Sequence, residues 1–130
     1  MNDPGDDVRS RGLAKMSQVY GWDVTDGPGD FFGLTVEHLF GEIWQRPGLS
    51  DRDRRLLIIG MVVGSGQEDV LDLQFPAALA NGELDDELLR EVVIFVAHYM
   101  GWPRAARTNT KAEAAISSAA KRTRAGGPTP

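Results

Sequence analysis

Apolar side chains recur at helical spacing along almost the whole chain, and this periodicity constrains the fold more than any other feature. The clearest run has five apolar residues at i, i+3, i+4, i+7 and i+8, which is the spacing of one face of a helix. Glycine, proline and capping residues interrupt the pattern and mark where each helix ends. The sequence therefore predicts an all-α fold of about six helices. The clearest run consists of Val36, Leu39, Phe40, Ile43 and Trp44.

The first three predicted helices lie in the N-terminal half of the chain. We expect a short helix over residues 13–20, and a second helix that Asp30 caps and that ends before Pro47. Ser50 opens the third helix, because serine is a good N-cap and an acidic residue follows at the third position. Residues 56–63 are apolar on every side of this helix, so we expect it to be central and buried.

Three further helices are predicted in the C-terminal half. The fourth ends at Asn81-Gly82, a strong C-terminal stop, and Pro76 inside it should kink the helix or shift its start. Asp85 caps the fifth helix, and Pro103 suits the first turn of the sixth. The expected core residues of the fourth helix are Leu71, Phe75, Ala78 and Leu79, those of the fifth are Leu88, Leu89, Val92, Val93, Val96 and Met100, and those of the sixth are Ala105, Ala112 and Ile116.

Length and composition set the domain organisation and the class of partner. A chain of 130 residues fits one domain, which we expect over residues 13–120, with polar, disordered tails at 1–12 and 121–130. The net charge of -5 argues against nucleic acid or an anionic membrane as a partner. No apolar run reaches the roughly 18 residues of a membrane span, and the N-terminus has no secretory signal, so we expect a cytoplasmic protein.

The chain contains no cysteine. This excludes disulfides, thiolate zinc sites, iron–sulfur clusters and every peroxidase reaction that passes through a thiol. The two histidines are far apart in the sequence and show no spacing such as His-x-x-x-His. We therefore expect no metal and no cofactor.

Three motifs occur together in a recognisable order. The first is the arginine-rich opening of the third helix over residues 50–58, the second is Phe-Pro-Ala-Ala-Leu-Ala-Asn-Gly over residues 75–82, and the third is Ala-His-Tyr-Met-Gly-Trp-Pro-Arg-Ala over residues 97–105. Over about residues 32–118 this order resembles the carboxymuconolactone decarboxylase family, which includes the alkylhydroperoxidase D-like proteins. The resemblance implies a bundle of two-helix hairpins. It also implies an obligate homo-oligomer, a trimer or hexamer, with pockets near the subunit contacts.

The redox residues of the peroxidase branch are absent. That branch carries Cys-x-x-Cys-x-x-x-His just before the Ala-Ala-Leu segment, where this chain has Gln67, Val70 and Gln74. The glutamate that the branch carries at the start of the third helix falls on Arg55. A thiol peroxidase is therefore excluded. The decarboxylase branch tends to carry a histidine where Gln74 lies, and glutamine can hydrogen-bond a carboxylate but cannot transfer a proton near neutral pH.

A few residues remain as candidates for chemistry. His98 is the candidate acid–base residue, because histidine titrates near neutral pH, and Tyr99 is the alternative proton carrier. His98 could equally be a histidine bonded to a carbonyl group or to a neighbouring subunit, and His38 a polar surface or interface residue. The candidate substrate-binding residues are Gln74, Arg55, Trp102 and Arg104.

The candidate binding residues also have structural interpretations. Guanidinium groups suit a carboxylate, but these arginines could instead form ordinary salt bridges. Trp102 could line a pocket or pack in a core or subunit interface.

Two functions fit these observations. The first is a carboxymuconolactone decarboxylase-like protein that acts as a non-redox decarboxylase, lyase or isomerase on a small carboxylate or lactone. The alternative is a catalytically silent oligomeric module that binds a small molecule or another protein. Convergence of His98, Gln74 and an arginine on one cavity would favour the enzyme.

Overall fold

The computed structural model describes residues 4–125, and over these residues it is all-helical, without strands. The predicted all-α fold is therefore confirmed. The chain forms two compact units, residues 1–51 and residues 52–130, which are described separately. The single domain over residues 13–120 and the oligomer stay predictions. The parts of the expected tails at 1–3 and 126–130 lie outside the described residues.

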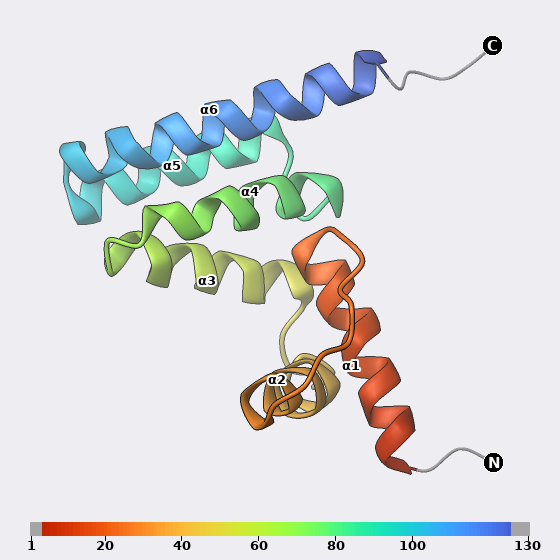
Figure 1. Ribbon diagram of the computed structural model, residues 1–130. Coiled ribbons are helices and arrows are strands. Elements are labelled where there is room, and N and C mark those ends of the chain that lie inside the picture. Colours follow the sequence, from red (N-terminus) through yellow and green to blue (C-terminus); the bar gives the residue numbers. More distant parts are fainter. Residues whose placement is uncertain (1–3, 126–130) are drawn as a thin grey trace. The chain divides into compact units, whose positions relative to one another are not determined.

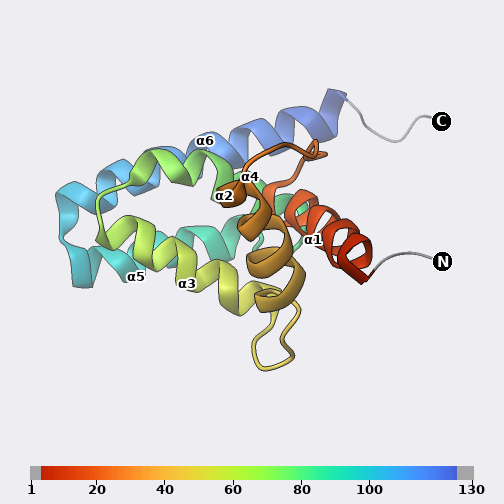
Figure 2. The same cartoon turned by 60° about the horizontal axis from the view of Figure 1, so that its bottom comes forward.

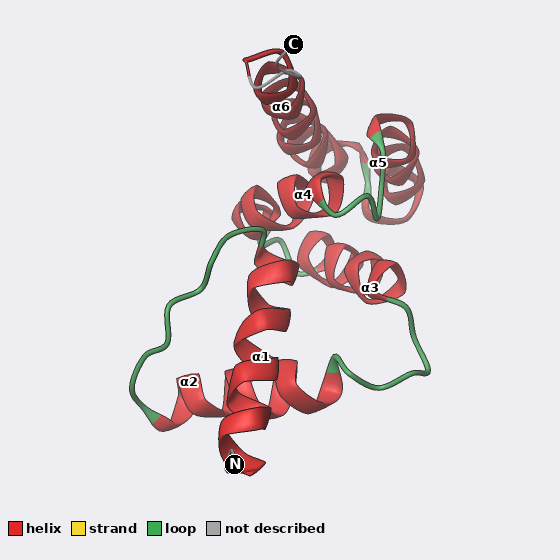
Figure 3. Ribbon diagram, turned by 90° about the vertical axis from the view of Figure 1, so that its right-hand side faces the viewer, coloured by secondary structure: helices red, strands yellow, loops and turns green. Residues whose placement is uncertain are grey.

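The first unit contains α1 (Pro4–Tyr20), α2 (Asp30–Leu34) and η1 (Thr35–Ile43). The helix α1 begins at Pro4 rather than at residue 13, so residues 4–12 are helical and not a tail. Its first turn is polar, and proline is well tolerated there because that turn needs no backbone donor. Asp30 is the first residue of α2 rather than its cap; Gly29 takes the cap position, and no side chain caps the helix. Figure 3 shows the loops that follow α1 and η1.

The predicted second helix changes its winding part-way. η1 is a π-helix, in which the backbone N–H of Trp44 donates to the carbonyl of Leu39 five residues earlier. This wider turn brings residues four apart onto one face. Val36, Phe40 and Trp44 are accordingly buried, whereas Leu39 and Ile43 are 42% and 39% exposed. The five-residue stripe is thus correct for three residues and wrong for two.

A close backbone approach joins α1 to η1. A Cβ atom at Gly12 of α1 would overlap the backbone carbonyl of Val36 in η1. Glycine is therefore required sterically at this crossing. The aromatic rings of Tyr20 and Phe40 pack edge to face across the same pair of helices, with centroids 5.6 Å apart.

The second unit contains α3 (Asp51–Gly64), η2 (Glu68–Val70), α4 (Leu71–Ala80), α5 (Asp86–Met100) and α6 (Trp102–Ala125). α6 runs beside α5 and also contacts α4 (Figures 1 and 2). α6 continues to Ala125, so residues 121–125 are helical rather than tail. The shared core contains eleven buried residues: Ile59, Val63, Leu71, Phe75, Ala78, Leu84, Leu89, Val93, Ala112, Ala115 and Ile116.

Two burial predictions for this unit are wrong. Helix α3 buries a single stripe at i, i+4 and i+8, and Leu57 and Met61 are 54% and 64% exposed, so it is not buried on every side. On α5, Leu88 and Met100 are each 39% exposed, while Ala97 is buried in their place. The buried face of α5 is thus displaced from the predicted one, since it runs through Leu89, Val93 and Ala97 and leaves Leu88 outside.

The helix ends of this unit follow the sequence signals. The backbone N–H of Leu88 donates to Oδ1 of Asp85 at 2.8 Å, which confirms Asp85 as the N-cap of α5. Helix α4 ends before Asn81, and Gly82 adopts φ of 71°. Pro103 lies in the first turn of α6, as expected. Pro76 lies inside α4, and the kink expected there stays a prediction.

The crossing of α1 and η1 yields the first testable prediction. Gly12→Ala should lower the free energy of unfolding by about 3 kcal/mol, the upper end of overpacking costs, because backbone must move to admit the methyl group. The measurement is urea unfolding followed by circular dichroism.

Gly60→Ala is the matched control, since no atom lies within 4 Å of a Cβ built at Gly60. In mid-helix that change should raise stability by about 0.5–1 kcal/mol. Equal stability of the Gly12→Ala variant and the wild type would contradict the close packing of α1 on η1.

Candidate functional site

A buried polar cluster lies in the second unit. Arg55 of α3 is fully buried, and its Nε donates to Oε1 of Glu83 at 2.6 Å. Its Nη1 donates to Oε1 of Gln74 of α4, also at 2.6 Å. Glu83, in the turn after α4, has only 7% of its side chain exposed. The structure thus brings together two predicted substrate-binding residues, Arg55 and Gln74, and adds Glu83, which the sequence analysis did not single out.

The contact with Arg55 fixes the orientation of the Gln74 amide. A guanidinium group donates and never accepts, so the atom of Gln74 that faces it is the oxygen. The amide nitrogen of Gln74 therefore points away from Arg55, and it has no hydrogen-bond partner among the described residues. No buried side-chain nitrogen or oxygen in this part of the chain lacks a partner, so this nitrogen must reach accessible surface. The cluster thus presents one oriented amide donor.

His98, Tyr99 and Trp102 lie together at the junction of α5 and α6. Nδ1 of His98 is 2.8 Å from the carbonyl oxygen of Ile94, one turn earlier in the same helix. Because a carbonyl only accepts, Nδ1 carries the proton and the neutral ring presents Nε2 as an acceptor. The ring of Trp102 lies 5.8 Å from that of His98, and Tyr99 and Trp102 are 77% and 66% exposed. No interaction of the described residues joins this group to Gln74 or Arg55, and neither His98 nor Gln74 lines the groove or the hollow described below. The convergence of His98, Gln74 and an arginine on one cavity, which would favour the enzyme, is thus not observed among the described residues.

Arg104, the remaining predicted binding residue, is engaged by the chain itself. Its Nη1 donates to the carbonyl oxygens of Val63 and Gly64 at the end of α3, at 3.3 and 2.9 Å. Its Nε also lies 3.7 Å from Oε1 of Glu68. The pKa of Glu68 is lowered, first by a backbone hydrogen bond and then by Arg107 and Arg104. Arg104 therefore ties α6 to the C-terminal end of α3.

A groove of about 430 Å³ opens on the same unit, with walls supplied mainly by α3 and α5. Two charged residues, Arg52 and Glu91, line it among otherwise apolar side chains. Gly60 leaves part of the wall without a side chain. The apolar walls are Leu56, Ile59, Leu84, Leu88, Val92, Phe95 and Val96.

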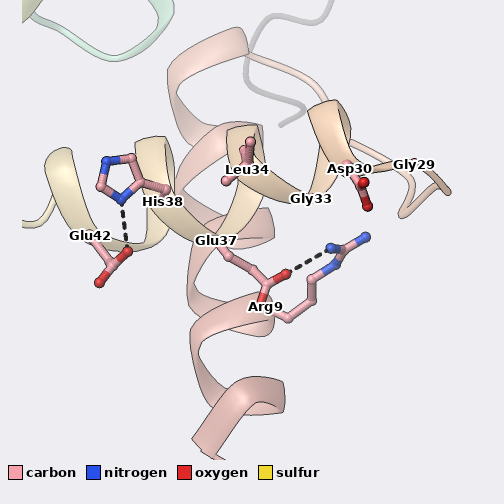
Figure 4. Close-up of a pocket in the computed structure, with 8 residues that line it drawn as sticks. All are labelled: Arg9, Gly29, Asp30, Gly33, Leu34, Glu37, His38 and Glu42. Carbon is pink, nitrogen blue, oxygen red and sulfur yellow. Dashed lines mark hydrogen bonds and ion pairs between the residues drawn. The ribbon is translucent and has the colours of Figure 1, made fainter.

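A polar hollow of about 630 Å³ lies in the first unit (Figure 4). Within it Nδ1 of His38 lies 2.9 Å from Oε1 of Glu42, and Nη1 of Arg9 donates to Oε2 of Glu37 at 3.2 Å. Arg9 also donates to Asp26 and thereby lowers the pKa of that carboxyl group. Each basic group here already faces a carboxylate, so the hollow is unsuited to an anionic substrate. His38 is 61% exposed and behaves as a polar surface residue.

Neither metal binding nor membrane spanning finds support in the described part of the chain. Among residues 4–125, no three histidine, aspartate or glutamate side chains gather closely enough to hold a metal ion. Within the same range, no helix is both long enough and apolar enough to cross a membrane.

Comparison with known proteins identifies the family. Residues 29–114 match the model of the carboxymuconolactone decarboxylase family. The chain belongs to this family. The resemblance inferred from the three motifs is thus confirmed.

Two curated relatives of this family member carry a named activity. The 4-carboxymuconolactone decarboxylase of Acinetobacter baylyi is 35% identical over 57% of this chain and 54% of its own length. The nitrosuccinic acid decarboxylase of Metarhizium robertsii is 39% identical over 54% of this chain and 48% of its own length. The chain thus spans about half the length of the curated relatives it matches. No solved structure matches it.

The buried cluster yields a stability prediction. Arg55→Met should cost about 3–5 kcal/mol, because Glu83 is then left buried without its partner charge. The double variant Arg55→Met/Glu83→Leu should be clearly more stable than Arg55→Met alone, since it removes both charges. Urea unfolding of the two variants measures the difference.

Arg90→Met provides the control, because the ion pair of Arg90 with Glu113 is about half exposed on both sides. It should leave the free energy of unfolding nearly unchanged. A double variant no more stable than Arg55→Met would show that the buried charges do not govern the stability of this unit.

Proposed function

We propose that this protein is a non-redox, cofactor-independent decarboxylase of a small carboxylate substrate, which acts without a thiol. The observation that carries the proposal is the family match together with two curated relatives, both named decarboxylases. The named substrates of these relatives are small acids that also carry an electron-withdrawing group, a lactone in one and a nitro group in the other. Such a group stabilises the electron pair that departing carbon dioxide leaves behind.

The reaction requires an oriented carboxylate and a proton. The bond between the carboxylate carbon and its neighbour breaks, the electron pair remains on that neighbour, and carbon dioxide leaves. A proton then takes its place on the carbon. The protein must therefore hold one carboxylate and deliver one proton near neutral pH.

The amide of Gln74 is the proposed carboxylate donor. Its nitrogen is free of other partners among the described residues, and its orientation is fixed by the bond that Arg55 donates to its oxygen. Glu83 in turn holds Arg55. A donor held in this way loses little side-chain freedom when it binds an anion.

His98 is the proposed proton carrier. Its Nδ1 is held by the carbonyl of Ile94, so Nε2 takes up a proton from solvent and then gives it to the carbon that carbon dioxide has left. Arg104 is a positioning residue in this proposal, because its guanidinium is committed to α3 and Glu68.

The test is release of carbon dioxide from 4-carboxymuconolactone and from nitrosuccinate by the purified full chain. We expect turnover of at least one of them without added metal or thiol. Gln74→Glu should lower kcat/KM at least about tenfold, because it replaces the amide donor by a carboxylate that repels the substrate. The same change keeps an acceptor for Arg55, so thermal stability should not fall.

Gln45→Glu is the matched control, since Gln45 is exposed and its side-chain amide bonds only the carbonyl of Phe40 among the described residues. It should leave kcat/KM unchanged. Full activity of the Gln74→Glu variant would contradict the role of Gln74. Absence of turnover with both substrates would overturn the decarboxylase and favour the silent binding module.

A further inference from the structure

The groove between α3 and α5 carries two charges that the chain itself does not use. Arg52 has no hydrogen bond or ion pair with any of the described residues, and the same is true of Glu91. Most other arginines of this unit are engaged, for example Arg55 with Glu83 and Arg90 with Glu113. An unengaged arginine beside an apolar wall is a ready donor for a carboxylate.

The apolar part of the groove is sized for a small molecule. Its volume of about 430 Å³ falls in the range of small-molecule sites. Four side chains of α5 and two of α3 supply most of the walls, and no polar residue lies among them. Gly60 widens the groove, because a side chain at this position would enter the open space rather than meet other atoms.

Glu91 gives the groove a direction. It is exposed and lies on α5, whereas Arg52 lies on α3, and no ion pair joins the two. A ligand with one carboxylate can bind Arg52 and keep that charge away from Glu91. A ligand with a second carboxylate on its apolar body places like charges near one another, at a cost in affinity.

We propose that this groove binds a monocarboxylate with an apolar body of about one ring, anchored by Arg52 and selected against dicarboxylates by Glu91. This ligand is distinct from the substrates of the proposed function, which carry two carboxylates, and the groove does not contain Gln74. Binding itself does not depend on turnover. The charge pattern favours such a ligand because Arg52 has no partner among the described residues and can pair with a carboxylate.

The test uses three probes with the same ring and no reactive group: 3-phenylpropanoate, the neutral 3-phenylpropan-1-ol, and phenylsuccinate. Dissociation constants are measured by NMR titration of the full chain. Arg52→Gln should raise the dissociation constant of 3-phenylpropanoate about tenfold and change that of the alcohol by less than about twofold. Glu91→Gln should lower the dissociation constant of phenylsuccinate about threefold or more and leave that of 3-phenylpropanoate nearly unchanged.

Two further variants complete the design. Arg54→Gln is the matched control, because it removes the same charge two residues along α3 from a residue that does not line the groove. It should change no dissociation constant by more than about twofold. Gly60→Leu should abolish binding of all three probes, since Gly60 lines the groove and a side chain that starts there extends into it.

The outcomes separate this inference from the proposed function. Tight 3-phenylpropanoate binding that depends on Arg52, without any decarboxylation, would support the groove and overturn the function. Decarboxylation of either dicarboxylate by a wild type that does not bind 3-phenylpropanoate would support the function and overturn the proposed binding site. If Arg52→Gln and Arg54→Gln weaken the binding of 3-phenylpropanoate equally, or if the wild type does not bind it, the proposed binding site is wrong. A change in sedimentation coefficient caused by Gly60→Leu without any probe would also overturn the proposed binding site, because it would indicate that a second copy of the chain covers the groove.

Discussion

The need to pair one buried guanidinium group determines how α3, α4 and the turn after α4 pack together in the second unit. Arg55 is completely buried, and an arginine cannot shed its charge at any ordinary pH. The fold must therefore bring acceptors to it, and it brings Gln74 from α4 and Glu83 from the following turn. The left-handed Gly82 ends α4 just before Glu83, and Asp85 starts α5 just after it. The tight turn between two helices thus also places the acceptor for Arg55.

The helix ends of the second unit could be predicted because their causes are local. Asp85 bonds a backbone N–H three residues on, and Gly82 adopts a conformation that glycine favours, so both are readable from short segments. The π-helical winding of η1 could not be read in this way, since the apolar spacing of an α-helix fits its sequence equally well. The wider turn of η1 occurs where Val36 packs against Gly12 of α1. These two residues are more than twenty positions apart in the sequence, so a short segment does not reveal their contact.

The candidate site was found in part. Arg55 and Gln74 were found because the resemblance placed both at positions that matter in the family, and the structure shows them in direct contact. Glu83 was missed because its pairing with Arg55 joins residues 28 apart in the sequence. One signal was available: Arg55 starts a stripe that continues with Ile59 and Val63 at helical spacing. A charged residue on a buried stripe implies a distant counter-charge, although it does not identify it.

The exchange of residue types at this cluster has a chemical consequence. By the resemblance, a glutamate and a histidine occupy the positions of Arg55 and Gln74 in relatives that move protons there. Neither arginine nor glutamine can take up or release a proton near neutral pH, and the nearby carboxylate of Glu83 is held by the guanidinium. The cluster can therefore orient an anion but cannot serve as acid or base through these two residues. A decarboxylase built on this chain must therefore separate the group that holds the substrate from the group that protonates the product. His38 lies in a hollow lined by carboxylates, and the proposed function accordingly assigns the proton transfer to His98.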